Sequence, residues 1–358
     1  MRRPDPPEVA GVLAASDVAA TAAYIASAQE PSGAIPWYPG GHTDPWDHVE
    51  CAMALSVAGH PGRAAAAYDW LRRTQRADGS WPTRVRGPVV EDATADVNHC
   101  AYVAVGVWHH TLATGDLSVA EAMWDTVRRM VAFVLRLQRP RGEVPWACDA
   151  YGVPADDALL TGCASIHQAL RCAAALADRL GRPQPDWELA AARLGHVIAA
   201  HEEVFGDRDR YSMDWYYPVL GGAVRGERAA ERFDASWDRF VVPGLGCRCV
   251  SDQPWVTGAE TCELVMALHA VGRTPEAVGL FAAVQRHLRE PDGSYWTGYQ
   301  FAEDVNWPDE HSTWTSAAVI LAADALSATT PASRIFADVR PLPFAPGHCG
   351  CAVPSPRA

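Results

Sequence analysis

The sequence predicts an all-α protein in which about six helical hairpins close into one ring. Two observations support this fold class. A short phrase, in which Gly is followed two to four residues later by Trp, recurs along the chain, and each copy stands between an amphipathic stretch and a more apolar one. Apolar residues make up 49% of the 358 residues, which is enough for a large common core. Recurring supersecondary units are the sequence signature of a repeat architecture.

The recurring phrase marks the turn of each hairpin. It has clear copies at 29–37, 75–81, 138–146 and 290–296 and weaker ones that end at Trp215 and Trp255. Gly supplies a turn conformation that residues with a Cβ adopt poorly. We interpret the Trp of the first three copies as structural residues that fold back over the helix ends: Trp37, Trp81 and Trp146.

Each unit therefore consists of an outer helix, a turn, a loop and an inner helix. The outer helices have apolar residues at helical spacing and Arg on the other face, as in the stretch 62–75. The inner helices are apolar nearly all round, which indicates that neighbours enclose them. They are expected to begin near residues 47, 94, 157, 216, 258 and 310. One hairpin cannot bury its own apolar face, so the units must stack, and six can close into a ring.

The ring is expected to occupy residues 1–328 as one domain. Its least regular part is the fourth unit, because residues 221–240 hold only about one long helix. From residue 329 to residue 358 the chain has six Pro and no helical period. This composition predicts an extended tail.

Composition argues against several classes of partner. The net charge is −13, from 43 acidic and 30 basic side chains, and every basic one is Arg. Without a basic run we expect no nucleic-acid or membrane-surface partner, and no run reaches the ~18 apolar residues of a membrane span. The N-terminus lacks the apolar region of a signal peptide, and half of the ten Cys lie in helical stretches as small apolar side chains. We therefore expect a reduced, cytoplasmic protein, and the sequence leaves its oligomeric state open.

Carboxylates and aromatic side chains gather in the loops that lead into the inner helices, around one mouth of the ring. An Asp before an apolar run commonly caps a helix, and we interpret Asp96 and Asp157 in that way. Asp47, Glu50 and Glu260 fit capping less well, because they are flanked by aromatic residues or continue into the helix. These three are the candidate catalytic residues.

These residue types suit the hydrolysis of a glycosidic bond. One carboxyl protonates the leaving oxygen while another activates water on the opposite face, and inversion needs the two about 6.5–9.5 Å apart. Trp and Tyr stack on the apolar faces of sugar rings, and 14 Trp is a high number for this length. This chemistry requires no metal and no cofactor. The candidate substrate-binding residues are Trp46, His48, Asp214, Trp215, Tyr216, Tyr217, Trp255, Asp304 and Trp307.

The recurring phrase, over residues 12–328, resembles the (α/α)6 toroid superfamily, which contains six-hairpin glycosidases, protein prenyltransferases and triterpene cyclases. Three segments are similar to the mycobacterial methylmannose polysaccharide hydrolases: TDPWDHVECAMAL (43–55), DWYYPVLGG (214–222) and PWVTGAETCEL (254–264). This second resemblance implies endo-cleavage of α-(1→4)-linked mannose in an oligosaccharide or polysaccharide, with Asp47 and Glu260 as the catalytic carboxylates.

The surroundings of these two carboxylates predict different roles. Glu260 begins an apolar helix near Trp255, and partial desolvation should raise its pKa and suit it to general acid catalysis. Asp47 lies in a stretch that we expect to be wetter, so it should stay ionised and act as the general base. Glu50 is the reserve candidate for the base, and Asp304 is the reserve for the far side of the ring.

A zinc-dependent prenyltransferase is the main alternative. The β-subunits of that family bind zinc through an Asp-x-Cys pair and a later His, and Glu260, Cys262 and His311 occupy comparable places. However, Glu replaces Asp, and the loops that would bind a diphosphate are acidic. Isoprenoid cyclisation and a non-catalytic carbohydrate-binding ring are two further alternatives. For cyclisation, the required Asp-x-Asp-Asp motif has only a poor match at 154–157.

Overall fold

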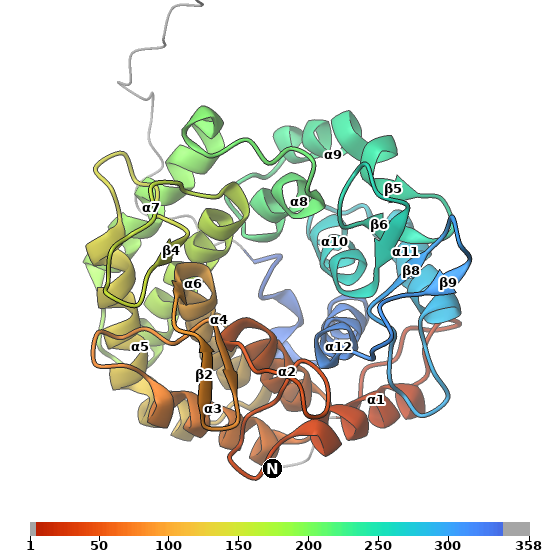
Figure 1. Cartoon of the computed structure of the whole chain (residues 1–358), viewed down its shortest axis with the longest axis horizontal. Helices are drawn as coiled ribbons and strands as arrows, with labels where there is room; N and C mark the ends of the chain where they lie inside the picture. Colours follow the sequence, from red (N-terminus) through yellow and green to blue (C-terminus); the bar gives the residue numbers. More distant parts are fainter. Residues whose placement is uncertain (1–4, 339–358) are drawn as a thin grey trace, which may run out of the picture.

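The computed structural model describes residues 5–338, and the twelve α-helices of this range form two concentric rings (Figure 1). The inner helices are α2 (Pro45–Val57), α4 (Val97–Thr114), α6 (Leu160–Arg179), α8 (Ser212–Leu220), α10 (Gly258–Ala270) and α12 (Thr313–Ser327). The outer helices are α1 (Ala15–Ala28), α3 (Pro61–Thr74), α5 (Ser118–Leu137), α7 (Pro185–Ala200), α9 (Glu227–Phe240) and α11 (Thr274–His287). The predicted all-α ring of six hairpins is confirmed.

Contacts between the inner helices close the ring. Each inner helix packs on the next one along the chain, and α12 packs back on α2. All 13 residues of α2 are buried, because α2 has inner helices on both sides and the outer ring behind it. The inner helices begin within four residues of the positions expected from the sequence. The irregular fourth unit is a short α8 followed by α9.

In the first three copies of the recurring phrase, the Gln ties the turn to the next outer helix. The side chain of Gln75 donates from Nε2 to the carbonyl of Gly79 in its own turn and to that of Thr126 in α5, at 2.9 Å in both cases. Gln29 and Gln138 make the equivalent pairs of bonds. The phrase therefore docks one hairpin on its neighbour, a role that the sequence analysis did not assign to the Gln.

The Gly of the phrase allows the same close approach. Gly79 has a φ of +97°, and a Cβ at this position would lie 2.3 Å from the carbonyl oxygen of Arg129 in α5. Gly293, in the last copy, meets the backbone of Ala20 in α1 in the same way. Since α1 is the first helix, this contact joins the last hairpin to the first. Gly is required here for its missing Cβ as much as for its φ.

The strands are two to four residues long and lie in the connections that lead into inner helices. Two antiparallel pairs are formed by β1 (Arg84–Arg86) with β2 (Val89–Asp92), and by β3 (Ala95–Asp96) with β4 (Ala147–Cys148). A five-stranded antiparallel sheet in sequence order lies beside α10 and α11 (Figure 1). Its strands are β5 (Val241–Val242), β6 (Gly246–Arg248), β7 (Trp255–Thr257), β8 (Gly298–Gln300) and β9 (Val305–Asn306).

Behind the ring, the chain that follows α12 crosses the side on which the inner helices end. It forms a short 3-10 helix at Pro331–Arg334, which contacts α4 and α12. Side chains from the ring then hold its backbone. The Nε2 of Gln168 donates to the carbonyl of Ile335 at 2.7 Å, and the guanidinium of Arg225 donates to the carbonyl of Phe336 at 2.6 Å. Residues 339–358 of the expected tail lie outside the described residues, and the domain boundary at residue 328 stays a prediction.

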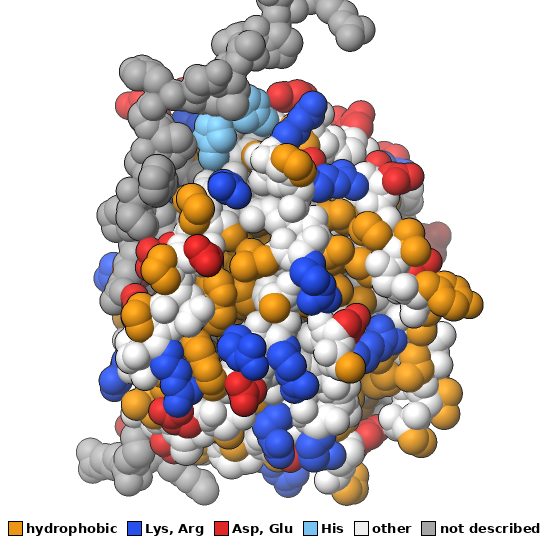
Figure 2. All heavy atoms as spheres, turned by 90° about the vertical axis from the view of Figure 1, so that its left-hand side faces the viewer, with side chains coloured by type: hydrophobic (Ala, Val, Ile, Leu, Met, Phe, Trp, Pro, Cys, Tyr) orange, Lys and Arg blue, Asp and Glu red, His pale blue; other side chains and the backbone are white. Residues whose placement is uncertain are grey.

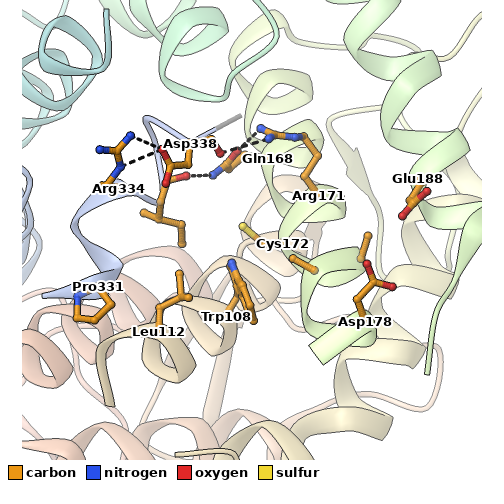
Figure 3. Close-up of a pocket in the computed structure, with 13 residues that line it drawn as sticks. Trp108, Leu112, Gln168, Arg171, Cys172, Asp178, Glu188, Pro331, Arg334 and Asp338 are labelled. Atoms are coloured by element: carbon orange, nitrogen blue, oxygen red, sulfur yellow. Dashed lines mark hydrogen bonds and ion pairs between the residues drawn. The ribbon is translucent and has the colours of Figure 1, made fainter. Parts of the chain in front are cut away.

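A cavity of about 270 Å³ lies between this segment and the ends of α4 and α6 (Figure 3). Trp108 and Leu112 of α4 line one part of it, and Arg171, Cys172 and Asp178 of α6 line another. This cavity contains none of the predicted site residues.

The outer surface carries charges of both signs. On the side shown in Figure 2, Arg and acidic side chains are intermixed and separated by hydrophobic ones. In residues 5–338, no helix combines the length and the hydrophobicity that a membrane span needs.

Candidate active site

The candidate site lies at the mouth of the ring where the inner helices begin. A cavity of about 310 Å³ opens there, between the N-terminal ends of α2, α4, α6 and α12. Its lining contains one of the predicted catalytic residues, Asp47, together with one predicted substrate-binding residue, Trp46. The full lining is Trp37, Trp46, Asp47, Asp96, Asn98, His99, Val144, Trp146, Leu159, Thr161, Gly162, Cys163, Ile166, Met213 and Trp314.

The first turn of α2 places Asp47 against a second carboxyl. Asp44 caps the helix, and its Oδ1 accepts the backbone N–H of Asp47 at 3.0 Å. The two side chains are also hydrogen-bonded to each other. Burial opposes the ionisation of Asp44, but the bonds from Asp47 and the nearby imidazole of His99 hold the pKa of Asp44 below its ordinary value. Asp44 therefore carries the negative charge of this pair.

The expectation that Asp47 lies in a wet loop and stays ionised is wrong. Its side chain is only 7% exposed, inside the first turn of a buried helix. Burial, and then the charge of Asp44, raise the pKa of Asp47 well above the usual range. A proton on Asp47 is consequently shared with Asp44 through their hydrogen bond.

Glu50 lies one helical turn deeper on the same face of α2. The hydroxyl of Tyr102 in α4 donates to its Oε1 at 3.0 Å. Burial raises the pKa of Glu50 to about 7, against the opposite effect of Tyr102 and of the Trp314 indole. Glu50 is 1% exposed, so it lies under the cavity and not in its wall.

Glu260 occupies the first turn of α10, which is separated from α2 by α12 alone in the inner ring. Its side chain is 5% exposed and its Oε2 has no hydrogen-bond partner. Burial raises the pKa of Glu260, and the side chains of Thr257 and Cys249 partly oppose this effect. The direction is the one expected for a general acid.

Sequence reasoning missed Glu263, one turn further along α10. It is fully buried, and the hydroxyls of Tyr216 and Tyr217 both donate to its carboxylate. Burial, followed by the charge of Glu50, raises the pKa of Glu263 well above its ordinary value. The signal was present in the sequence, because Glu260 and Glu263 have the same i, i+3 spacing as Asp47 and Glu50.

The four consecutive candidates in α8 do not share one face. Tyr216 and Tyr217 point into the ring towards α10. Trp215 points the other way, where it packs on Phe233 and Phe240 of α9 and donates from Nε1 to a backbone carbonyl of that helix. Adjacent helical residues diverge by about 100°, so Trp215 is turned away from the ring centre and, with Asp214, lines a different cavity beside α9.

Asp214 is also used inside the protein. It accepts from the backbone N–H of Thr161 at 2.9 Å and from the hydroxyl of the same residue. Its carboxylate joins the start of α6 to the start of α8, and burial raises its pKa. Asp214 is therefore not a free substrate-binding group.

His48 is another predicted contact with a structural role. It is completely buried, and its two ring nitrogens lie 3.0 Å from the backbone N–H of Ile35 and from the carbonyl of Ala67. Burial lowers its pKa to about 4. No ring nitrogen is left for a ligand.

The remaining candidates lie on the sheet beside the ring. Trp255 and Trp307 contact each other edge to face, and the indole of Trp255 donates to the carbonyl of Trp307 at 3.1 Å. Asp304 is an exposed residue between β8 and β9 that accepts from the hydroxyl of Tyr299 at 2.5 Å. All three are absent from the lining of the cavity at Asp47.

The aromatic wall of the cavity includes two residues that the sequence analysis took as structural. Trp46 stacks on Tyr102 with ring centroids 4.0 Å apart. Trp37 and Trp146 line the cavity, and Trp146 is 37% exposed. Only Trp81 of the first three phrases is fully buried, with its indole bonded to a carbonyl of α3. Because all three Trp occupy the same place in the phrase, the sequence did not distinguish the buried Trp from the two that line the cavity.

The side chains proposed for zinc do not assemble into a ligand set. Among residues 5–338 no group of three or more His, Cys, Asp or Glu side chains is arranged to hold a metal ion. Cys262 is fully buried, and burial raises the pKa of its thiol well above its ordinary value. His311 packs against Trp296 with ring centroids 4.3 Å apart.

A comparison with curated proteins decides between the alternatives. The chain is 60% identical over 333 residues to the MMP endo-(1,4)-3-O-methyl-alpha-D-mannosidase of Mycolicibacterium hassiacum, and the match covers 93% of this chain and 92% of that protein. The chain belongs to this family. It is a glycoside hydrolase, and the predicted resemblance to the methylmannose polysaccharide hydrolases is confirmed. The prenyltransferase alternative is wrong.

Solved structures agree with the fold. A glycosidase variant in complex with glucose aligns with a TM-score of 0.70 at 18% identity over 87% of this chain and 96% of its own. A D-mannose isomerase aligns with a TM-score of 0.67 at 11% identity over 86% of this chain and 96% of its own. At these identities the likeness concerns the fold alone. No protein-family model matches the chain.

Proposed function

We propose that this protein is an inverting endo-hydrolase of α-(1→4)-linked mannose chains that carry 3-O-methyl groups, with Asp47 and Glu260 as its catalytic pair. The relative that is 60% identical is named for this substrate. The observation that carries the proposal is the placement of two buried first-turn carboxyls, on inner helices separated only by α12, at the mouth of one ring.

Glu260 is proposed as the general acid. It donates its proton to the glycosidic oxygen as the bond from that oxygen to the anomeric carbon breaks. A raised pKa keeps this proton in place near neutral pH, and burial supplies that shift. The Oε2 of Glu260 is buried and has no hydrogen-bond partner within the protein, so this oxygen is not committed to another side chain.

Asp47 is proposed as the general base, with Asp44 as its partner. Water attacks the anomeric carbon from the face opposite the leaving oxygen, and its proton passes to Asp47. The ionised Asp44 stabilises the protonated form of Asp47 through their hydrogen bond. Asp47 is therefore a stronger base than an ordinary aspartate, but it must start ionised, which moves the onset of activity to higher pH.

Aromatic residues around the pair are proposed to bind the sugar units. Trp46, Trp37 and Trp146 line the cavity beside Asp47, and their faces suit stacking on hexose rings. Trp255 and Trp307 offer an aromatic edge for units further along a long chain. A cytoplasmic location stays a prediction.

Product analysis tests the proposal. The protein is incubated with a 3-O-methylated α-(1→4)-mannooligosaccharide, and the products are followed by mass spectrometry and by proton NMR of the new reducing end. We expect internal cleavage and a first-formed β-anomer, with cleavage by Glu260→Gln slower by about 10²- to 10⁴-fold. A first-formed α-anomer would refute inversion, and release of single terminal units would refute endo-cleavage.

A further inference from the structure

The cavity beside Asp47 has one polar side and one apolar side. The polar side is built from the starts of α2 and α4 and carries Asp47, Asp96, Asn98 and His99. The apolar side is built from the connection before α6, from α6 itself and from the first turn of α8. Its apolar side chains are Val144, Leu159, Cys163, Ile166 and Met213.

The polar atoms of the apolar side are already in use. The hydroxyl of Thr161 donates to Asp214, so it is turned towards α8. The thiol of Cys163 and the backbone of Val144 bond each other, at 3.3 Å from the thiol to the carbonyl and 3.4 Å from the N–H to the sulfur. Apart from Trp146, an indole of the same connection that also lines the cavity and is 37% exposed, this side consequently offers a ligand apolar surface and no free side-chain donor.

Two residues present most of that surface. Val144, Cys163 and Ile166 are each 1% exposed, whereas Leu159 and Met213 are partly exposed. Leu159 immediately precedes α6, and Met213 lies in the first turn of α8. The two side chains therefore form the accessible part of the apolar side.

We propose that Leu159 and Met213 form a methyl-ether pocket, which selects 3-O-methylated mannose units over unmethylated ones. The reaction itself is the one in the proposed function, on which this inference rests. A methyl ether has no hydrogen to donate and gains by leaving water. A free hydroxyl in the same place loses its bonds to water without a replacement. Discrimination by one methyl-sized group in an apolar pocket is roughly 10- to 200-fold.

Polar substitution of the pocket tests this inference. Leu159→Gln and Met213→Gln each give an unmethylated 3-hydroxyl a hydrogen-bond partner and remove apolar contact with the methyl group. The matched control is Leu189→Gln, because Leu189 is also partly exposed, at 36%, but lies on the outer helix α7. The kcat/KM values are compared for methylated and unmethylated α-(1→4)-mannooligosaccharides of equal length.

We expect wild type and Leu189→Gln to prefer the methylated substrate by at least about tenfold. Leu159→Gln and Met213→Gln should lower this ratio by about fivefold or more, with melting temperatures near that of wild type. An unchanged ratio in both pocket variants would overturn the inference, and so would a wild-type ratio near one.

Binding measurements separate this inference from the proposed reaction. Titration calorimetry on Glu260→Gln gives the Kd ratio for the same two oligosaccharides without turnover. If wild type cleaves neither substrate while the Kd ratio still depends on Leu159 and Met213, the proposed reaction is wrong but the methyl-ether pocket is supported. Equal affinity for both oligosaccharides, or binding of neither, would overturn the pocket.

Discussion

Helices α2 and α10 each carry two carboxyls at the same spacing, but the partners of these carboxyls differ. The inner members accept bonds from Tyr hydroxyls. Glu263 accepts from Tyr216 and Tyr217, whereas Glu50 accepts from Tyr102 alone and its Oε2 has no partner. The outer members, Asp47 and Glu260, lie in the first turns of their helices, at the mouth of the ring. Glu260 has an unpartnered oxygen, and Asp47 shares a proton with Asp44.

This difference distinguishes the carboxyls that can transfer a proton from those that only change the pKa of their neighbours. A carboxyl that transfers a proton needs a free oxygen and access to the substrate. Glu50 and Glu263 are buried one turn deeper and lack that access, but both still raise the pKa of Asp47. Burial is the largest cause of the raised pKa in all four groups, and neighbouring carboxylates add to it for Asp47, Glu50 and Glu263.

The largest expected effect separates the outer pair from the inner pair. Asp47→Asn and Glu260→Gln should each lower kcat/KM about 10²- to 10⁴-fold, the usual contribution of one general acid or base. Glu50→Gln and Glu263→Gln should cost about tenfold or less, because they change only the surroundings of the reacting groups. All four variants are assayed on one methylated oligosaccharide.

Melting temperatures provide the control for these assays, since loss of fold would mimic loss of catalysis. Inner variants that lose as much activity as outer ones, while still folded, would abolish the proposed division of roles.

The second effect concerns stability. The pKa of Glu50 is about 7 in the folded protein, above the ~4.3 of an unfolded Glu. The raised pKa means that Glu50 favours the folded state fully below the unfolded value, and this contribution is lost as pH rises through about 7. Glu50→Gln removes the ionisation and should raise the free energy of unfolding at pH 8 by roughly 4 kcal/mol relative to wild type, at 1.36 kcal/mol per pKa unit.

Urea unfolding of both proteins at pH 5 and pH 8 measures this difference. The advantage of Glu50→Gln should be much smaller at pH 5. A variant that is less stable than wild type at pH 8 would contradict the assignment of a buried, unfavourably ionised Glu50.

The ring could be predicted from the sequence because its determinants are local. The Gln of the first three copies and the Gly of the phrase act within one turn and the next outer helix, so the same letters recur wherever the same contact is made. Asp47 and Glu260 could be proposed because they are flanked by aromatic residues or continue into the helix, and because the resemblance to the methylmannose polysaccharide hydrolases implied that they form the catalytic pair.

The rest of the site depends on the direction in which each side chain points, and a sequence motif does not specify that direction. Asp214 to Tyr217 form one polar-aromatic run, but a helix sends Trp215 to α9 and Tyr216 to the ring centre. Trp37 and Trp81 close the same phrase, yet one faces the cavity and the other the core. The burial of Asp47 likewise required the packing of α2 among its neighbours.

The smallest expected effect is a shift of the pH profile. Asp44→Asn keeps a good helix cap but removes the charge that helps to raise the pKa of Asp47. The base must be ionised, so the acid limb of kcat/KM should move to lower pH. The alkaline limb should stay in place, because Asp44 is not among the groups that shift the pKa of Glu260. An acid limb that does not move would show that Asp44 does not raise the pKa of the general base.

The most direct test of the outer pair as acid and base uses a leaving group that needs no proton. The substrate is a methylated α-(1→4)-mannooligosaccharide with a 2,4-dinitrophenyl aglycon, and kcat is compared with that for the natural linkage. We expect Glu260→Gln to regain most of its activity on the activated substrate, while Asp47→Asn stays impaired on both, because water must still be activated. Equal losses for Glu260→Gln on the two substrates would contradict its role as the general acid.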